Sequence, residues 1–131
     1  MADSALQLEL VAADRLVWSG QVTSVITRTT EGELGILANH APLMAVLVGT
    51  TVEVRPVDGE RWIAAIDGGF LSVANNRVSI LSADAELSGE IDLEQARRDL
   101  ESAQTAGEDN RADDDAVRHA EARIQAVERG S

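Results

Sequence analysis

The chain has 131 residues, 44% of them apolar, and a formal net charge of -12. This charge argues against binding to nucleic acid or to an anionic membrane surface, because both repel an acidic chain over a Debye length of about 8 Å. The absence of cysteine excludes disulfides and thiolate metal sites, and no apolar run approaches the ~20 residues that span a bilayer. We therefore expect a soluble protein without direct membrane insertion, whose partners are basic or neutral.

The first two thirds of the chain have the pattern of short β-strands. Leu6, Leu8 and Leu10 alternate with polar residues, which is the period of a strand with one buried face. Further β-rich runs follow at residues 22–26, 35–37, 43–48, 51–55, 61–66, 70–73 and 78–81. Turn signals separate them at 19–20, 56–59, 68–69 and 75–76. This spacing predicts an antiparallel β-sandwich domain over residues 1–86.

The pattern changes to helical spacing after Leu87. Asp92 and Gln95 have the positions of a capping box, and Gly107 is placed to end the helix that follows. A second helix is predicted from Asn110 or Asp113, with an apolar face made of Ala116, Val117, Ala120, Ile124 and Val127. Residues 87–131 are thus predicted to form an antiparallel two-helix hairpin, which makes the chain an α+β protein. Its alanine-rich stripes are narrow, so we expect the hairpin to need a docking surface.

The segment Glu31-Gly-Glu-Leu-Gly-Ile-Leu-Ala-Asn-His-Ala-Pro-Leu43 combines turn residues, two carboxylates and an imidazole. It resembles the strand and loop that mark the ε subunit of bacterial F-type ATP synthases, with Ala38 and Asn39 in place of a Pro-Gly pair. Four other stretches resemble that family in the same order: Leu8–Val11 with Asp14–Gly20, then Asp67–Val73, then Asn76–Leu81, and last Ala85–Glu86 with Glu90–Asp92. The resemblance covers roughly residues 6 to 100.

The resemblance implies a noncatalytic central-stalk subunit. Members of this family carry a β-sandwich that binds the γ subunit and the rotor ring of c subunits, and a helical hairpin that is either folded on the sandwich or extended along the stalk. It also implies a peripheral position on the cytoplasmic side of the cell membrane, within the ATP synthase complex. The alternative that the residues leave open is a free-standing β-sandwich module that binds a protein or a small ligand.

Three residues are candidates for rotor-ring contact on the strength of the resemblance: Glu31, Glu33 and His40. Exposed carboxylates can pair with cations of a partner, although a surface pair contributes only about 0–1 kcal/mol. Solvated carboxylates flanking a turn are the alternative. The other imidazole, His119, is predicted to face solvent on the second helix.

No residues indicate a catalytic or metal site. Gly68 and Gly69 lack the spacing and lysine of a phosphate loop and are predicted to form a hairpin turn. The run Asp113-Asp114-Asp115 lacks the spacing of a calcium loop and is predicted to start the second helix. We expect neither a catalytic residue nor a cofactor.

Some members of the family bind ATP through a motif at the start of the first hairpin helix. Ile91, Asp92 and Ala96 match that motif, but Gln95 replaces its arginine and cannot offer a guanidinium to phosphate. We therefore expect no ATP binding. In inhibitory members, basic residues of the extended hairpin contact the catalytic β subunit. The residues of this hairpin in a position to do so are Arg111, Arg118, Arg123 and Arg129, with nearby acids opposing them.

Overall fold

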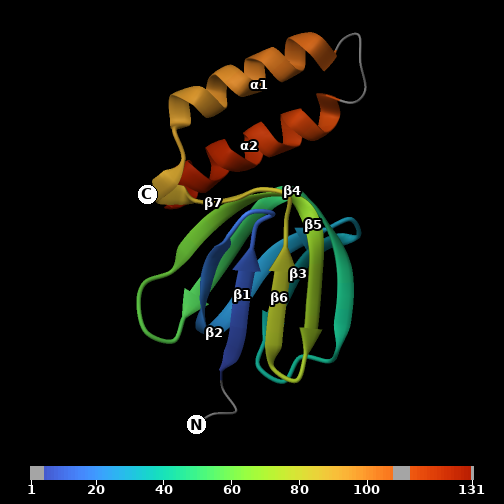
Figure 1. Ribbon diagram of the computed structural model, residues 1–131, viewed down its shortest axis with the longest axis vertical. Helices are drawn as coiled ribbons and strands as arrows, with labels where there is room; N and C mark the ends of the chain where they lie inside the picture. The colour runs from blue at the N-terminus through green and yellow to red at the C-terminus, as the bar shows by residue number, and fades with distance from the viewer. Residues whose placement is uncertain (1–4, 108–112, 131) are drawn as a thin grey trace.

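The computed structural model describes residues 5–107 and 113–130. Its seven strands are β1 (Leu6–Val11), β2 (Leu16–Thr29), β3 (Gly32–Leu37), β4 (Leu43–Pro56), β5 (Trp62–Ala74), β6 (Arg77–Leu81) and β7 (Ala85–Leu87). A short 3-10 turn, η2 (Ser88–Glu90), leads to the helices α1 (Leu93–Gly107) and α2 (Asp113–Gly130). The predicted organisation, a β-sandwich followed by a helical hairpin, is confirmed (Figure 1).

The strands form one hydrogen-bonded system in the order β1-β6-β5-β4-β2-β3, and β1 also pairs with β2. The sheet therefore curls round and joins itself, with β3 added beside β2 and β7 beside β5. The pairings are antiparallel except that of β1 with β6, which is parallel and was not predicted. This closure encloses a core of Leu, Ile, Val and Ala side chains, among them Leu8, Val25 and Ile80, each fully buried.

Three of the expected breaks between strands are absent. Ser19 and Gly20 lie inside β2, paired with Glu9 and Leu8, so the predicted turn there is wrong. The runs 43–48 and 51–55 form the single strand β4, and the runs 61–66 and 70–73 form the single strand β5. Hydrogen-bonded register continues through both, with Leu47 opposite Gly69 and Gly49 opposite Asp67.

Gly68 and Gly69 bend β5 without ending it. Their φ angles are +72° and +131°, and a β-carbon on Gly69 would collide with the carbonyl oxygen of Leu81. The glycine pair was predicted as a hairpin turn, which is wrong, because positive φ serves here to fold one long strand from one layer of the sandwich into the other. The predicted turns at 56–59 and at Asn75–Asn76 are confirmed, the latter with φ of 52° and 61°.

The hairpin lies across the end of the sandwich opposite the N-terminus, with α2 between α1 and the strands (Figure 1). Since α2 is covered on two sides, its buried residues differ from the single face that was predicted. Ala120, Ala122 and Ala126 are buried, whereas Ala116 is exposed.

The sheet ends at Leu87, one residue beyond the predicted boundary between residues 1–86 and 87–131. Neither described helix has the length and hydropathy that a membrane span requires.

Candidate interaction sites

The three candidates for rotor-ring contact do not form one surface. Glu31 lies in the turn between β2 and β3, Glu33 lies on β3 opposite Arg28, and His40 follows the far end of that strand. β3 is about 20 Å long by the usual rise per residue. The turn at Glu31 is at the helix-bearing end, since Glu33 shares a cavity of about 210 Å³ with Gln125 and Arg129 of α2. The two carboxylates therefore lie near the helix-bearing end of β3, and the imidazole lies near the other end.

The loop that carries His40 is held by hydrogen bonds. The His40 amide donates to the carbonyl oxygen of Leu37 at 3.2 Å, and Nδ1 lies 2.7 Å from the Ala41 carbonyl oxygen. That contact requires the proton on Nδ1 and leaves Nε2 as the other ring nitrogen. Next to it, the Asn39 amide donates to Oδ1 of Asn76 at 2.6 Å, which ties this loop to the β5–β6 turn.

The residues of the degenerate ATP motif have structural roles. The Asp92 carboxylate accepts a hydrogen bond from the Gln95 amide at 3.1 Å, which confirms Asp92 as the N-cap of α1. The Gln95 side chain does not complete the capping box but pairs with Asp99 and Arg98. Ala96 is fully buried, and Ile91 packs against Ile63 and Ala65 of β5.

Two of the four hairpin arginines that were predicted to contact a β subunit are engaged with the sandwich. Arg123 pairs with Glu86 of β7 and with Asp99 of α1, and its side chain is only 13% exposed. Arg129 donates to Thr51 and lies 3.8 Å from Glu53, both on β4. Arg118 is 58% exposed, and its ion pair among the described residues is with Asp115 at 3.7 Å. Arg111 lies outside the described residues.

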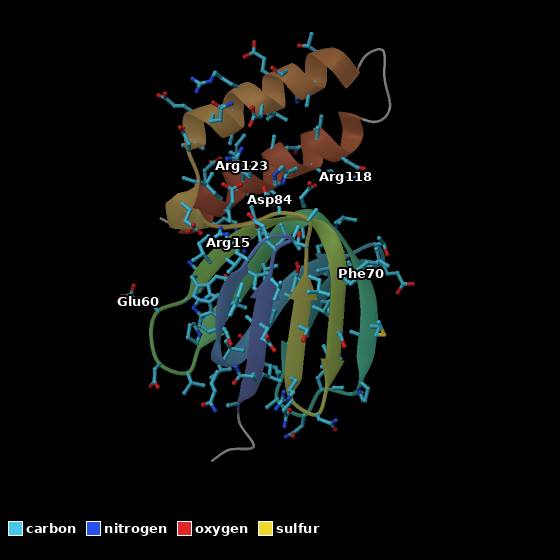
Figure 2. The ribbon with its side chains drawn as sticks, in the orientation of Figure 1. Arg15, Glu60, Phe70, Asp84, Arg118 and Arg123 are labelled. Atoms are coloured by element: carbon cyan, nitrogen blue, oxygen red, sulfur yellow. The ribbon has the colours of Figure 1, made fainter. Side chains whose placement is uncertain are left out.

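His119 was predicted to face solvent and instead faces the sandwich. Its Nε2 is 3.3 Å from the Asp84 carboxylate, its side chain is 22% exposed, and Nδ1 is buried without a hydrogen-bond partner. With Glu86 these two residues could offer three ligand atoms within 4.8 Å. Arg123 already places a guanidinium on Glu86, however, so a cation occupies this position and the cluster is an ion-pair network at the hairpin junction. Figure 2 shows Arg123 on α2 and Asp84 at the end of the sandwich that faces the hairpin.

An exposed apolar patch was not found by sequence reasoning. Val46 of β4 is opposite Phe70 of β5, which is opposite Leu81 of β6, and Met44 lies two residues before Val46. Directly paired residues and residues two apart share a face of the sheet. Their exposed fractions are 78% for Met44, 51% for Val46, 58% for Phe70 and 53% for Leu81. Met44, Val46 and Phe70 also line a shallow, mainly apolar cavity of about 190 Å³ with Ala45.

The sequence contains the alternation that places these residues on one face, but the alternation is compatible with that face being either buried or exposed. The alternation in 43–48 and 70–73 indicates which residues share a face, but not which face is covered by other strands. Only the closure of the sheet shows that Leu47 and Leu71 point inward and their neighbours outward. Figure 2 shows Phe70 on the flank of the sandwich, away from the helices' junction with β7.

In comparisons with known proteins, the matching family model and the similar proteins agree on one family. The family described as "ATP synthase, Delta/Epsilon chain, beta-sandwich domain" matches residues 5–88. The chain is 48% identical over 122 residues to the ATP synthase epsilon chain of Streptomyces avermitilis, covering 93% of this chain and 94% of that one. It is 44% identical over 124 residues to that of Nocardia farcinica, covering 94% and 90%.

Solved structures of similar shape come from the same kind of assembly. A chain of the Euglena gracilis mitochondrial ATP synthase, in a structure of OSCP, F1 and the c-ring, matches with a TM-score of 0.74 and 27% identity, covering 95% of this chain and 78% of that chain. A chain of the Tetrahymena thermophila mitochondrial ATP synthase central stalk and c-ring has a TM-score of 0.59. At 16% identity, the second likeness concerns the fold alone.

Proposed function

The chain belongs to the family of ATP synthase epsilon chains, and on this premise we propose that it is a noncatalytic central-stalk subunit that couples the rotor ring to the γ subunit. In this role the subunit is a peripheral part of an F-type ATP synthase on the cytoplasmic side of the cell membrane. A closed, well-packed β-sandwich suits this role, because a rigid body transmits torque without dissipating it. Binding and positioning, rather than bond chemistry, are its contribution.

The observation that carries the proposal is the exposed patch of Met44, Val46, Phe70 and Leu81. Exposed apolar side chains that lie together on a sheet mark a protein-binding surface. Large aromatic and methionine side chains are typical of the centre of such surfaces. We assign this patch to the γ subunit, because the stalk partner must hold the sandwich throughout rotation and a mainly apolar contact is not weakened by the screening of charges.

The rotor-ring contact is assigned to the acidic end of β3. Glu31 and Glu33 are both exposed and two residues apart, so they can pair with cations of one ring surface. His40 lies at the other end of the strand. If the ring contacts the helix-bearing end, His40 belongs to a different contact.

Inhibition of ATP hydrolysis by the hairpin requires it to leave the sandwich. Arg123 and Arg129 have carboxylate partners within this chain. In the docked hairpin the side chain of Arg118 is 58% exposed, that of Arg129 is 50% exposed, and that of Arg123 is only 13% exposed. Inhibitory contact is therefore a property of an undocked hairpin.

The test is binding of the purified chain to an F1 core of α, β and γ subunits that lacks its own epsilon chain. Phe70→Glu places a charge at the centre of the patch and is expected to weaken binding by about tenfold or more. Leu16→Glu is the matched control, because Leu16 is 55% exposed but lies on β2 outside the patch. Circular dichroism checks that both variants fold.

Equal affinities of wild type, Phe70→Glu and Leu16→Glu would remove the patch from the γ contact. A wild-type chain that does not bind the core at all would contradict the stalk assignment itself.

A further inference from the structure

Strand β3 is an edge of the sheet. It pairs with β2 along its whole length, from Gly32 opposite Thr29 to Leu37 opposite Ser24, without a register shift. Among the described strands β2 is its one partner, because β3 stands at the end of the strand order and the sheet closes through β1 and β2. An edge strand presents a row of backbone N–H and C=O groups that have no ladder partner.

The hydrogen bonds of β2 determine which backbone groups of β3 face outward. The Thr30 amide donates to the Val46 carbonyl oxygen of β4 at 3.1 Å, so every second residue of β2, counted back from Thr30, directs its backbone groups to β4 and the others direct theirs to β3. The β3 residues opposite those others are Gly32, Leu34 and Ile36. The remaining residues of β3 therefore direct their backbone groups away from β2, and they are Glu33, Gly35 and Leu37. In agreement, the Leu37 carbonyl oxygen accepts from the His40 amide, outside the ladder.

The residues with outward backbone groups also leave room for a neighbour. Glu33, Gly35 and Leu37 are all exposed, Leu37 to 64%. A β-carbon added to Gly35 would have nothing within 4 Å. The strand itself is held by its other face, where Ile36 is fully buried in the core and Leu34 packs against it. β3 has no proline, no bulge and no inward-pointing charge, which are devices that protect an edge from pairing.

The charge of this edge selects the partner. Glu33 is opposite Arg28 of β2, but among the described residues no ion pair joins its carboxylate to a cation. A second copy of this chain does not fit, because each copy carries a charge of -12. Antiparallel pairing of two copies about Gly35 would also set Glu33 against Leu37 of the copy. The edge is complementary to a segment that brings a cation to Glu33 and an apolar side chain to Leu37.

We propose that β3 is a docking strand, to which an extended segment of a partner protein adds in the antiparallel direction. Along its chain the segment presents an apolar side chain opposite Leu37, then an aromatic side chain over Gly35, then a lysine or arginine opposite Glu33. The outward backbone groups of β3 hold the segment, and the three side chains select it. The proposal concerns the backbone of β3, so it does not rest on the rotor-ring assignment of Glu33.

The experiment follows the backbone amides of the full chain by nuclear magnetic resonance. In the free chain the amides of Leu34 and Ile36 should exchange with solvent slowly, whereas those of Glu33, Gly35 and Leu37 should exchange rapidly. The probe is the end-blocked peptide Thr-Leu-Thr-Tyr-Thr-Arg-Thr, added up to about 1 mM. Binding should shift the three outward amides saturably and slow their exchange several-fold, because each then donates to the peptide.

A matched pair of variants separates the backbone from the side chain. Gly35→Pro removes the outward N–H, and proline is tolerated on an edge strand where the N–H is not used by the ladder. It should weaken peptide binding about fivefold or more. Gly35→Ala keeps the N–H and places its β-carbon in open space, so its affinity should be close to that of the wild type. Slow exchange at Leu34 and Ile36 in both variants shows that β3 remains paired with β2.

Two further comparisons test the partner's chemistry on the unmutated fold. A peptide with N-methyltyrosine in place of tyrosine lacks only the N–H that reaches the Gly35 carbonyl oxygen, and it should bind about fivefold more weakly. Glu33→Gln should weaken binding about threefold, since an exposed ion pair contributes little. With glutamate in place of arginine, the peptide should bind Glu33→Gln better than the wild type.

Rapid and slow exchange that do not alternate along β3 would overturn the proposal, because the edge would then be covered in the free chain. Equal affinity of the peptide for Gly35→Pro and Gly35→Ala, or of the two tyrosine peptides for the wild type, would also overturn it. The same holds for a peptide that gives no saturable shift. Shifts of the three outward amides with protein concentration alone would replace the partner segment with a second copy of this chain.

Discussion

Asn39 and Asn76 connect the two loops at the end of the sandwich away from the helices. The Asn39 amide donates to Asn76 Oδ1 at 2.6 Å, and Asn76 Nδ2 donates to Asn39 Oδ1 at 3.3 Å. Both residues have left-handed backbone, with φ of 67° and 61°. Asparagine tolerates this region better than most residues, so one residue type supplies both the turn and the connection.

Asn76→Ala is therefore expected to destabilise the chain by about 1–3 kcal/mol. The substitution removes two hydrogen bonds, and the β-carbon of alanine makes the positive φ at this position strained. Asn76→Gly removes the same hydrogen bonds without the backbone strain and should cost less. Urea unfolding followed by tryptophan fluorescence measures both. Equal losses for the two variants would show that backbone strain contributes nothing here.

Gly69→Ala should be among the most damaging single changes in the sandwich. The new β-carbon would collide with the Leu81 carbonyl, and φ of +131° is strained for any other residue. We expect a loss of more than about 3 kcal/mol, or failure to fold. Gly35→Ala is the control, because nothing lies within 4 Å of its added β-carbon and its φ is not positive. Thermal melts of the two variants should differ widely.

Asp92→Ala removes the N-cap of α1 and is expected to cost about 1 kcal/mol of helix stability. Asp92→Ser retains a capping oxygen and should restore most of this loss. Hydrogen exchange at the amides of the first turn of α1 measures the effect locally. Protection in Asp92→Ala equal to that in the wild type would show that the cap is dispensable in the docked hairpin.

Substitutions at the two ends of β3 distinguish the two contact surfaces. Glu31→Lys and Glu33→Lys are expected to lower ATP-driven proton pumping in the assembled complex without unfolding the sandwich, whereas His40→Ala should have little effect. Glu9→Lys, at an exposed position of β1, is the control. Loss of pumping in His40→Ala alone would move the ring contact to the opposite end of the strand.

The expected lack of ATP binding also remains a prediction. The Asp92 carboxylate caps α1, and the Gln95 side chain is occupied by Asp99 and Arg98. Calorimetric titration of the isolated chain with MgATP should show no saturable binding in the micromolar range. Saturable heat in that range would mean that groups other than the missing arginine hold the phosphates.

The sequence by itself determined the two-part organisation, because it depends on local periodicity. Alternation at Leu6, Leu8 and Leu10 requires a half-buried strand, and Asp92 followed by helical spacing requires a capped helix. The turn at Asn75–Asn76 was predictable for the same reason, since its backbone is a local property of asparagine. The family resemblance rests on equally local motifs.

The tertiary structure decided which surfaces meet. Gly68–Gly69 has the composition of a turn, and only the pairing of β5 with β4 and β6 makes it a bend within one strand. His119 and Arg123 have the composition of a solvated helix face, but α2 lies between α1 and the sandwich and turns them towards Asp84 and Glu86. Long-range contacts of this kind depend on how the sheet closes, and closure is a property of the whole chain rather than of any segment.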